Sequence, residues 1–208
     1  MTITGQVFRV AVVCLALFAG VATAQAHSFR PSGSNAGIPI PSIGHGEMAI
    51  IASHQRNIMN LALSALDTNE EFRRVLNFSQ LQNTVCMWGV MPGSISDETS
   101  PFNECSHAYL AAVKMVLLQM RTMPAEAKRA EQLVSQIDEE MVLNGMALIS
   151  CQFSAETFNS ADVISPNWLD IPAHGPSVIA SLGALLFASG CTWGGVRGLK
   201  KHARQSGT

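Results

Sequence analysis

The residues best suited to chemistry in this 208-residue chain are its five cysteines, six histidines and ten methionines. Thiolate, imidazole and thioether groups are the ligands that copper and zinc prefer in proteins. Their spacing matches no short metal-binding motif, because no Cys-x-x-Cys, Cys-x-x-Cys-His or His-x-x-x-His pattern occurs in the chain. A metal site would therefore have to be assembled by the fold from residues far apart in sequence.

Four stretches within residues 47–152 carry apolar residues at three- and four-residue spacing, which predicts amphipathic helices. The first covers about 47–66, the second opens with Thr68 as its N-cap, and the third and fourth begin at Pro101 and Pro124. Helices joined by short connections favour an up-and-down antiparallel bundle. The predicted fold class is therefore all-α, with a small bundle of about four helices and one C-terminal transmembrane helix.

Neighbouring helices in such a bundle run in opposite directions. One end of the bundle therefore holds the starts of the first and third helices and the ends of the second and fourth. That end collects ligand-type side chains: His45, Glu47, Cys86, Met87, Met91, Cys105, His107 and Cys151. A site for copper, zinc or haem is one interpretation of this group, with Cys86, Cys105, His107, Cys151 and His45 as candidate metal ligands.

Two arguments weigh against a metal site that uses all of these residues. Cys105 and His107 are two positions apart, so on a helix they point about 200° apart and cannot converge on one ion. In addition, cysteines of exported proteins more often form disulfides than metal sites. The sequence favours a Cys86–Cys105 disulfide, which closes a loop of roughly 20 residues and contributes about 3 kcal/mol. Pairing of Cys105 with Cys151 is the competing connectivity.

The N-terminal residues 1–26 have the features of a secretory signal peptide. A single early arginine is followed by an apolar run, and Ala24-Gln25-Ala26 gives the small-x-small pattern that signal peptidase cuts after. An uncleaved N-terminal anchor is the alternative. Residues 27–46 are rich in proline and glycine and predict an extended arm.

The C-terminal residues 175–196 carry no charged side chain and extend about 33 Å as a helix, enough to cross a bilayer. The basic tail 197–208 marks the cytoplasmic side, so the bulk of the chain faces the periplasm and the protein belongs to a bacterial inner membrane. A buried core helix of a soluble domain is the alternative. These segments leave a helical periplasmic domain at 47–152 and an irregular linker at 153–174.

Composition excludes several classes of function. With 13 Lys+Arg against 15 Asp+Glu, the chain lacks the positive charge of a general nucleic-acid binder. No nucleophile-elbow, zinc-protease or nucleotide-binding motif occurs, so the sequence favours a protein without catalytic activity. The leading expectation is an accessory or interaction protein of an envelope assembly that contacts the membrane and protein partners. The alternative is a periplasmic metal- or haem-handling protein.

Overall fold

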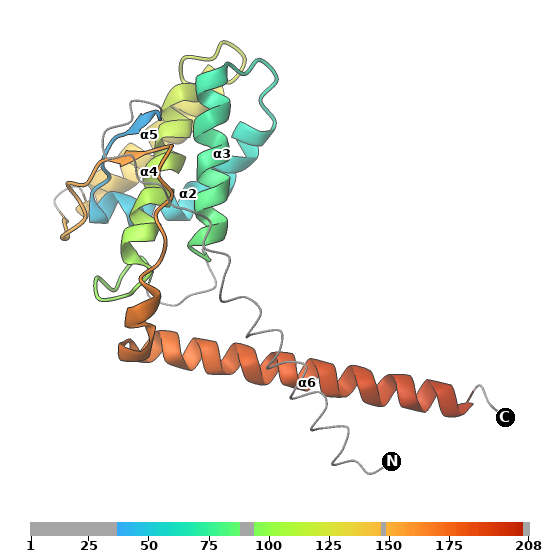
Figure 1. Ribbon diagram of the computed structural model, residues 1–208. Coiled ribbons are helices and arrows are strands. Elements are labelled where there is room, and N and C mark those ends of the chain that lie inside the picture. The colour runs from blue at the N-terminus through green and yellow to red at the C-terminus, as the bar shows by residue number, and fades with distance from the viewer. Residues whose placement is uncertain (1–36, 88–93, 147–148, 206–208) are drawn as a thin grey trace. The chain divides into compact units, whose positions relative to one another are not determined.

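The computed structural model describes residues 37–87, 94–146 and 149–205, the last of these from 195 onward for the backbone alone. The expected signal peptide, the first half of the expected arm and Met91 lie outside the described residues. The elements, in chain order, are β1 (Pro39–Ile40), α2 (His45–Leu63), α3 (Glu70–Val85), α4 (Asn103–Met120), α5 (Ala127–Leu143), β2 (Phe158–Asn159), the 3₁₀ helix η2 (Trp168–Ala173) and α6 (Gly175–Gln205) (Figure 1). The prediction of a mainly helical protein is confirmed.

Helix α4 begins at Asn103 rather than at Pro101, and the starts of two other helices also differ from the sequence-based prediction. The N-cap of α3 is Asn69 rather than Thr68, because the Asn69 Oδ1 accepts a hydrogen bond from the Phe72 backbone N–H at 2.7 Å. Pro124 lies in a turn that precedes α5, where the Ala127 N–H bonds back to the Met123 carbonyl. Each correction moves a boundary by a few residues and leaves the helix in place.

Helix α4 is the centre of the helical domain. Its buried residues lie on every side of the helix, as expected for a helix that is surrounded by others. It packs against α3, α2 and α5, and its buried apolar side chains are Cys105, Ala108, Tyr109, Leu110, Ala111, Ala112, Val113, Val116, Leu117 and Met120.

The helices pair as α3 with α4 and α2 with α5, and α2 also crosses α4 (Figure 1). Contacts at both ends show that α3 and α4 are antiparallel, since Glu71 bonds Gln119 near one end and a disulfide joins the helices at the other. The crossing of α2 over α4 is fixed by a hydrogen bond from the Tyr109 hydroxyl to Gln55 and by the Lys114–Glu47 ion pair. These contacts do not establish an up-and-down four-helix bundle.

The segments on either side of the helices pair with each other. Strand β1 lies antiparallel to β2, with Ile40 opposite Phe158, and both of these side chains are buried. The stretch 153–174, which the sequence interprets as a linker, therefore contains β2 and η2 and returns to the helical domain. It covers the ends of α3 and α4, where the disulfide lies.

Helix α6 contains the one candidate membrane span found in the described part of the chain. Its residues Gly175–Gly194 are long and apolar enough to cross a bilayer, and almost none of this stretch is buried by the rest of the protein. Large apolar side chains along it are exposed: Ile179, Leu182, Leu185, Leu186, Phe187 and Trp193. This exposure is opposite to that of a buried core helix, which was the alternative interpretation of the segment.

Candidate metal centre

Two of the five candidate metal ligands form a disulfide in the structure. Cys86 and Cys105 are bonded to each other, with their Cα atoms 5.6 Å apart, and this is the pairing that the sequence favours. The buried Gln82 amide lies beside both sulfur atoms. A sulfur atom in a disulfide is not available as a thiolate ligand, so a metal site must use the remaining candidates.

The other three candidates, His45, His107 and Cys151, lie together. One ligand atom from each residue falls within 4.8 Å of the other two. The closest pair is the Cys151 Sγ and the His107 Nε2, which are 3.1 Å apart. Ligands held 2.0–2.3 Å from a tetrahedral zinc ion are themselves separated by about 3.3–3.8 Å. Small side-chain rotations would therefore bring all three onto one ion.

Three different elements supply these ligands. His45 is the first residue of α2, His107 lies in the second turn of α4, and Cys151 follows α5 in an irregular segment. Cys105 and His107 point to different partners, one to the disulfide with α3 and the other to Cys151, as their two-residue spacing on a helix requires. The site therefore forms only when α2 and α4 have packed together.

Ser154 holds the irregular segment in place against α2. Its hydroxyl oxygen accepts hydrogen bonds from the Cys151 backbone N–H at 2.8 Å and the His45 backbone N–H at 3.2 Å. The same hydroxyl donates to the Cys151 Sγ at 3.5 Å. A hydroxyl that bonds both ligand residues fixes their backbones relative to each other, which is the role of outer partners in metal sites.

The environment of His107 favours a neutral imidazole. Burial and, to a smaller extent, repulsion from the nearby His45 together lower the pKa of His107 from 6.5 to about 4. The Ile43 backbone carbonyl opposes this pKa shift. Its contact with the imidazole is not a well-formed hydrogen bond, and the buried His107 Nδ1 has no other partner. The His45 Nδ1 is also buried without a partner. Neutral imidazole is the form of histidine that binds metal ions.

A cysteine beside a histidine can also act as a nucleophile. That chemistry uses a thiolate paired with an imidazolium, and a third group that orients the imidazole. The lowered pKa of His107 disfavours the imidazolium, and none of the described side chains bonds its Nδ1 to orient the ring. The arrangement therefore fits a metal ligand set better than a catalytic pair.

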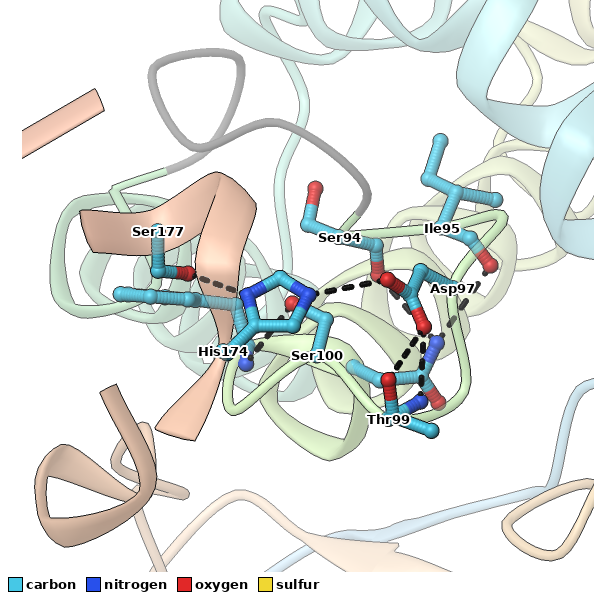
Figure 2. A network of polar contacts seen from close by, with 9 residues as sticks. Ser94, Ile95, Asp97, Thr99, Ser100, His174 and Ser177 are labelled. Atoms are coloured by element: carbon cyan, nitrogen blue, oxygen red, sulfur yellow. Dashed lines mark hydrogen bonds and ion pairs between the residues drawn. The ribbon is translucent and has the colours of Figure 1, made fainter. Parts of the chain in front are cut away.

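A second polar cluster joins the start of α6 to the segment before α4, and sequence reasoning missed it. Figure 2 shows His174 between Asp97 and Ser177, with its Nε2 at 2.9 Å from the Asp97 Oδ2 and its Nδ1 at 2.7 Å from the Ser177 Oγ. Bonds from His174 and Thr99 lower the pKa of Asp97 to about 2. The sequence signal for this cluster is modest: an Asp-x-Thr turn and a histidine just before a helix start.

Although aspartate, histidine and serine also form hydrolase triads, this cluster does not have the accessibility that a hydrolase needs. Ser177 is 0 % exposed, so its hydroxyl cannot reach a substrate. It also lies three residues after His174, in the first turn of α6, so the contact between the two side chains is a local one at the helix start. The cluster therefore attaches α6 to the helical domain.

No protein-family model, curated protein or solved structure matches this chain.

Proposed function

We propose that this chain is an exported, membrane-anchored protein whose helical domain binds one copper or zinc ion through His45, His107 and Cys151. The observation that supports this most strongly is the convergence of three ligand atoms from three separate elements within 4.8 Å. One thiolate and two imidazoles are a donor set used for both metals. A position for a fourth ligand would face solvent, since His45 and Cys151 are only half-buried.

A single ion fits this arrangement better than haem. Haem iron takes axial ligands from its two opposite faces, so its protein ligands do not cluster around one point. In this site the Cys151 Sγ and the His107 Nε2 are already within contact distance of each other. A planar macrocycle cannot lie between two ligand atoms at that separation.

The proposed placement of the domain combines the two ends of the chain. The signal-like residues 1–26 would carry the domain across the inner membrane, α6 would span it, and the basic tail would stay in the cytoplasm. The Cys86–Cys105 disulfide supports an oxidising compartment for the domain. The metal site would then lie in the periplasm.

Metal analysis of the purified full-length chain tests this proposal. The chain in mild detergent, loaded with zinc or copper(I) and then dialysed, should retain about one ion per chain. Cys151→Ser and His107→Gln should each lose it, whereas His54→Gln should keep it. His54 is the matched control, because it is a partly buried histidine of α2 that bonds Glu140 instead. Equal metal contents in the Cys151→Ser and His54→Gln proteins would contradict the proposal.

An interaction role without a metal is the second candidate, and it is the leading expectation from sequence. The observation in its favour is that the helical domain exposes several large apolar side chains, among them Leu66, Val142 and Leu143. A metal-free protein that co-purifies with the same membrane partners in fixed proportion would support this role over metal binding.

A further inference from the structure

The residues just before α6 expose large apolar side chains although they lie outside the candidate span. Leu169 is 89 % exposed and Trp168 is 53 % exposed, and no residue of η2 is buried. Further along the chain, in α6, Ile179 and Leu182 are also exposed. Exposed leucine and tryptophan beside a spanning helix are typical of the membrane interface.

Three contacts hold this juxtamembrane segment, residues 167–174, to the segment before α4. The Asn167 backbone N–H donates to the Pro101 carbonyl at 2.9 Å. The ring of Trp168 lies edge-on to the buried Phe102 ring, with centroids 5.8 Å apart.

The third contact is the one from His174 to Asp97 in Figure 2. Since His174 is itself buried, this bond is shielded from water better than a surface ion pair. The start of the anchor is thus attached to the domain through a backbone hydrogen bond, an aromatic contact and a hydrogen bond to a carboxylate.

We propose that the juxtamembrane segment docks on the lipid surface, with Leu169 and the exposed edge of Trp168 inserted at the level of the headgroups. The inference rests on the proposed anchor, because α6 brings this segment to the bilayer. Docking would hold the helical domain at the membrane instead of leaving it on a flexible tether.

The chemistry of the segment indicates which part of the lipid it meets. The Asp and Glu residues of this segment and of the turn that it contacts are Asp170, Asp97 and Glu98, and neither stretch contains Lys or Arg. Asp170 is bonded to Asn167. Acidic groups do not attract anionic headgroups, so insertion would depend on apolar contact. Docking should therefore occur on phosphatidylcholine and be insensitive to salt.

Docking also determines where the metal centre lies. Phe102, which contacts Trp168, is five residues before His107 along α4, a rise of about 8 Å. The metal centre would then be close to the membrane surface, within reach of a membrane-embedded donor or acceptor of the ion.

Fluorescence of Trp168 tests the docking in the full-length chain. Trp88→Phe and Trp193→Phe together leave Trp168 as the single tryptophan, since the chain has three. The protein is reconstituted in phosphatidylcholine liposomes that carry bromine at shallow or deep acyl positions. We expect shallow bromine to quench Trp168 about twofold more strongly than deep bromine, in low and high salt alike.

Two leucine variants of that single-tryptophan protein provide the comparison. Leu169→Glu should reduce the quenching by about half, because a carboxylate resists insertion. Leu66→Glu changes a leucine that is 92 % exposed, and it should leave the quenching unchanged. Leu66 comes shortly before α3, and the start of α3 contacts α4 at Gln119. Gln119 is about 24 Å along α4 from Asn103, which is the end of α4 next to the juxtamembrane segment.

The possible results distinguish failure of the docking proposal from failure of the anchor proposal. If the protein floats with the liposomes while Trp168 is quenched by aqueous acrylamide and not by brominated lipid, the docking proposal is overturned and the anchor proposal stays intact. Equal effects of Leu66→Glu and Leu169→Glu also overturn it. Protein that does not float with the liposomes refutes the anchor and the docking together.

Discussion

Gly46 lies against the backbone carbonyl of Met146, so close that a β-carbon at position 46 would overlap its oxygen atom. The Gly46 backbone N–H also donates to the Ile149 carbonyl at 3.1 Å. These contacts bring the start of α2, which carries His45, against the segment that leads to Cys151. The absence of a side chain at position 46 is thus a condition for the geometry of the candidate metal centre.

Gly46→Ala should weaken metal binding although it removes no ligand. The added methyl group must displace the Met146 carbonyl, and overpacking of this kind costs about 1–3 kcal/mol. If about 1.4 kcal/mol of that cost falls on the metal-bound state and not on the metal-free state, the metal affinity drops tenfold. Gly44→Ala is the control, because a β-carbon there would make ordinary contact, at 3.8 Å, with the Ile149 carbonyl. Competition titration of zinc against a chelator measures both variants.

The stability of the metal-free protein should depend on pH through His107. In the folded state its pKa is about 4 against 6.5 for an ordinary histidine. Between these values the unfolded chain binds a proton that the folded chain does not. The free energy of unfolding should therefore fall as the pH falls from about 6.5 to 4, by roughly 3 kcal/mol, with no contribution from His107 above that range.

Urea denaturation of the metal-free chain at a series of pH values measures this dependence. His107→Gln should flatten the slope between pH 6.5 and 4, even if it lowers stability at every pH. Asp97 does not interfere, because its pKa of about 2 keeps it ionised in this range and the stability it gives is lost only at lower pH. Identical slopes in the two proteins would show that burial does not hold His107 neutral.

The sequence predicts the helical elements and the Cys86–Cys105 bond, since both follow from local patterns. Apolar periodicity sets the helices, and the two cysteines flank a single connection, so their proximity needs no knowledge of the tertiary fold. The crossing of α2 over α4 depends on side-chain packing between distant residues such as Gln55 and Tyr109. No periodicity encodes that crossing.

The sequence could predict which residues are candidate metal ligands, but not which of them form the candidate metal centre. The sequence groups all five candidate ligands at one end of the domain only on the assumption of alternating helix directions. Their separation into a disulfide and a His45–His107–Cys151 group depends on which face of α4 meets which neighbour. The attachment of His174 to Asp97 joins segments 77 residues apart, and no sequence pattern links them.

Thiol mapping should recover one bonded pair and one free thiol in the helical domain. Blocking reagent added to unreduced protein should label Cys151 and leave Cys86 and Cys105 joined, because only the latter two are bonded in the structure. Bound zinc should slow the labelling of Cys151, since a coordinated thiolate is a poorer nucleophile. A Cys105–Cys151 peptide in the digest would contradict this connectivity.

Replacement of the disulfide should cost stability without removing the metal ligands. Cys86→Ala together with Cys105→Ala should lower the free energy of unfolding by about 3 kcal/mol in the chain-entropy model. Denaturation of the oxidised protein and the double variant gives the difference. The double variant should still bind zinc where it remains folded, because His107 and Cys151 are unchanged.

Gln82 should be important for stability, because it is the buried link between α3 and the segment that leads to the anchor. Its side-chain amide donates to the Ile164 carbonyl at 2.6 Å and accepts from the Ile164 N–H at 3.1 Å. Gln82→Leu would leave both backbone groups without partners, at a cost of about 1–3 kcal/mol each. Gln80→Leu on the exposed face of the same helix should change stability by less than about 0.5 kcal/mol. Thermal denaturation compares the two.

The proposed orientation of the chain in the membrane rests on the charge of its tail. Arg197, Lys200 and Lys201 come directly after the candidate span, and positive charge is retained on the cytoplasmic side. A reporter that is active only in the cytoplasm should therefore work when fused after Thr208 and fail when fused after Asp170. Replacement of the basic residues of the tail by glutamine should weaken this preference. Activity of the Asp170 fusion and silence of the Thr208 fusion would place the metal centre in the cytoplasm, where a structural disulfide does not persist.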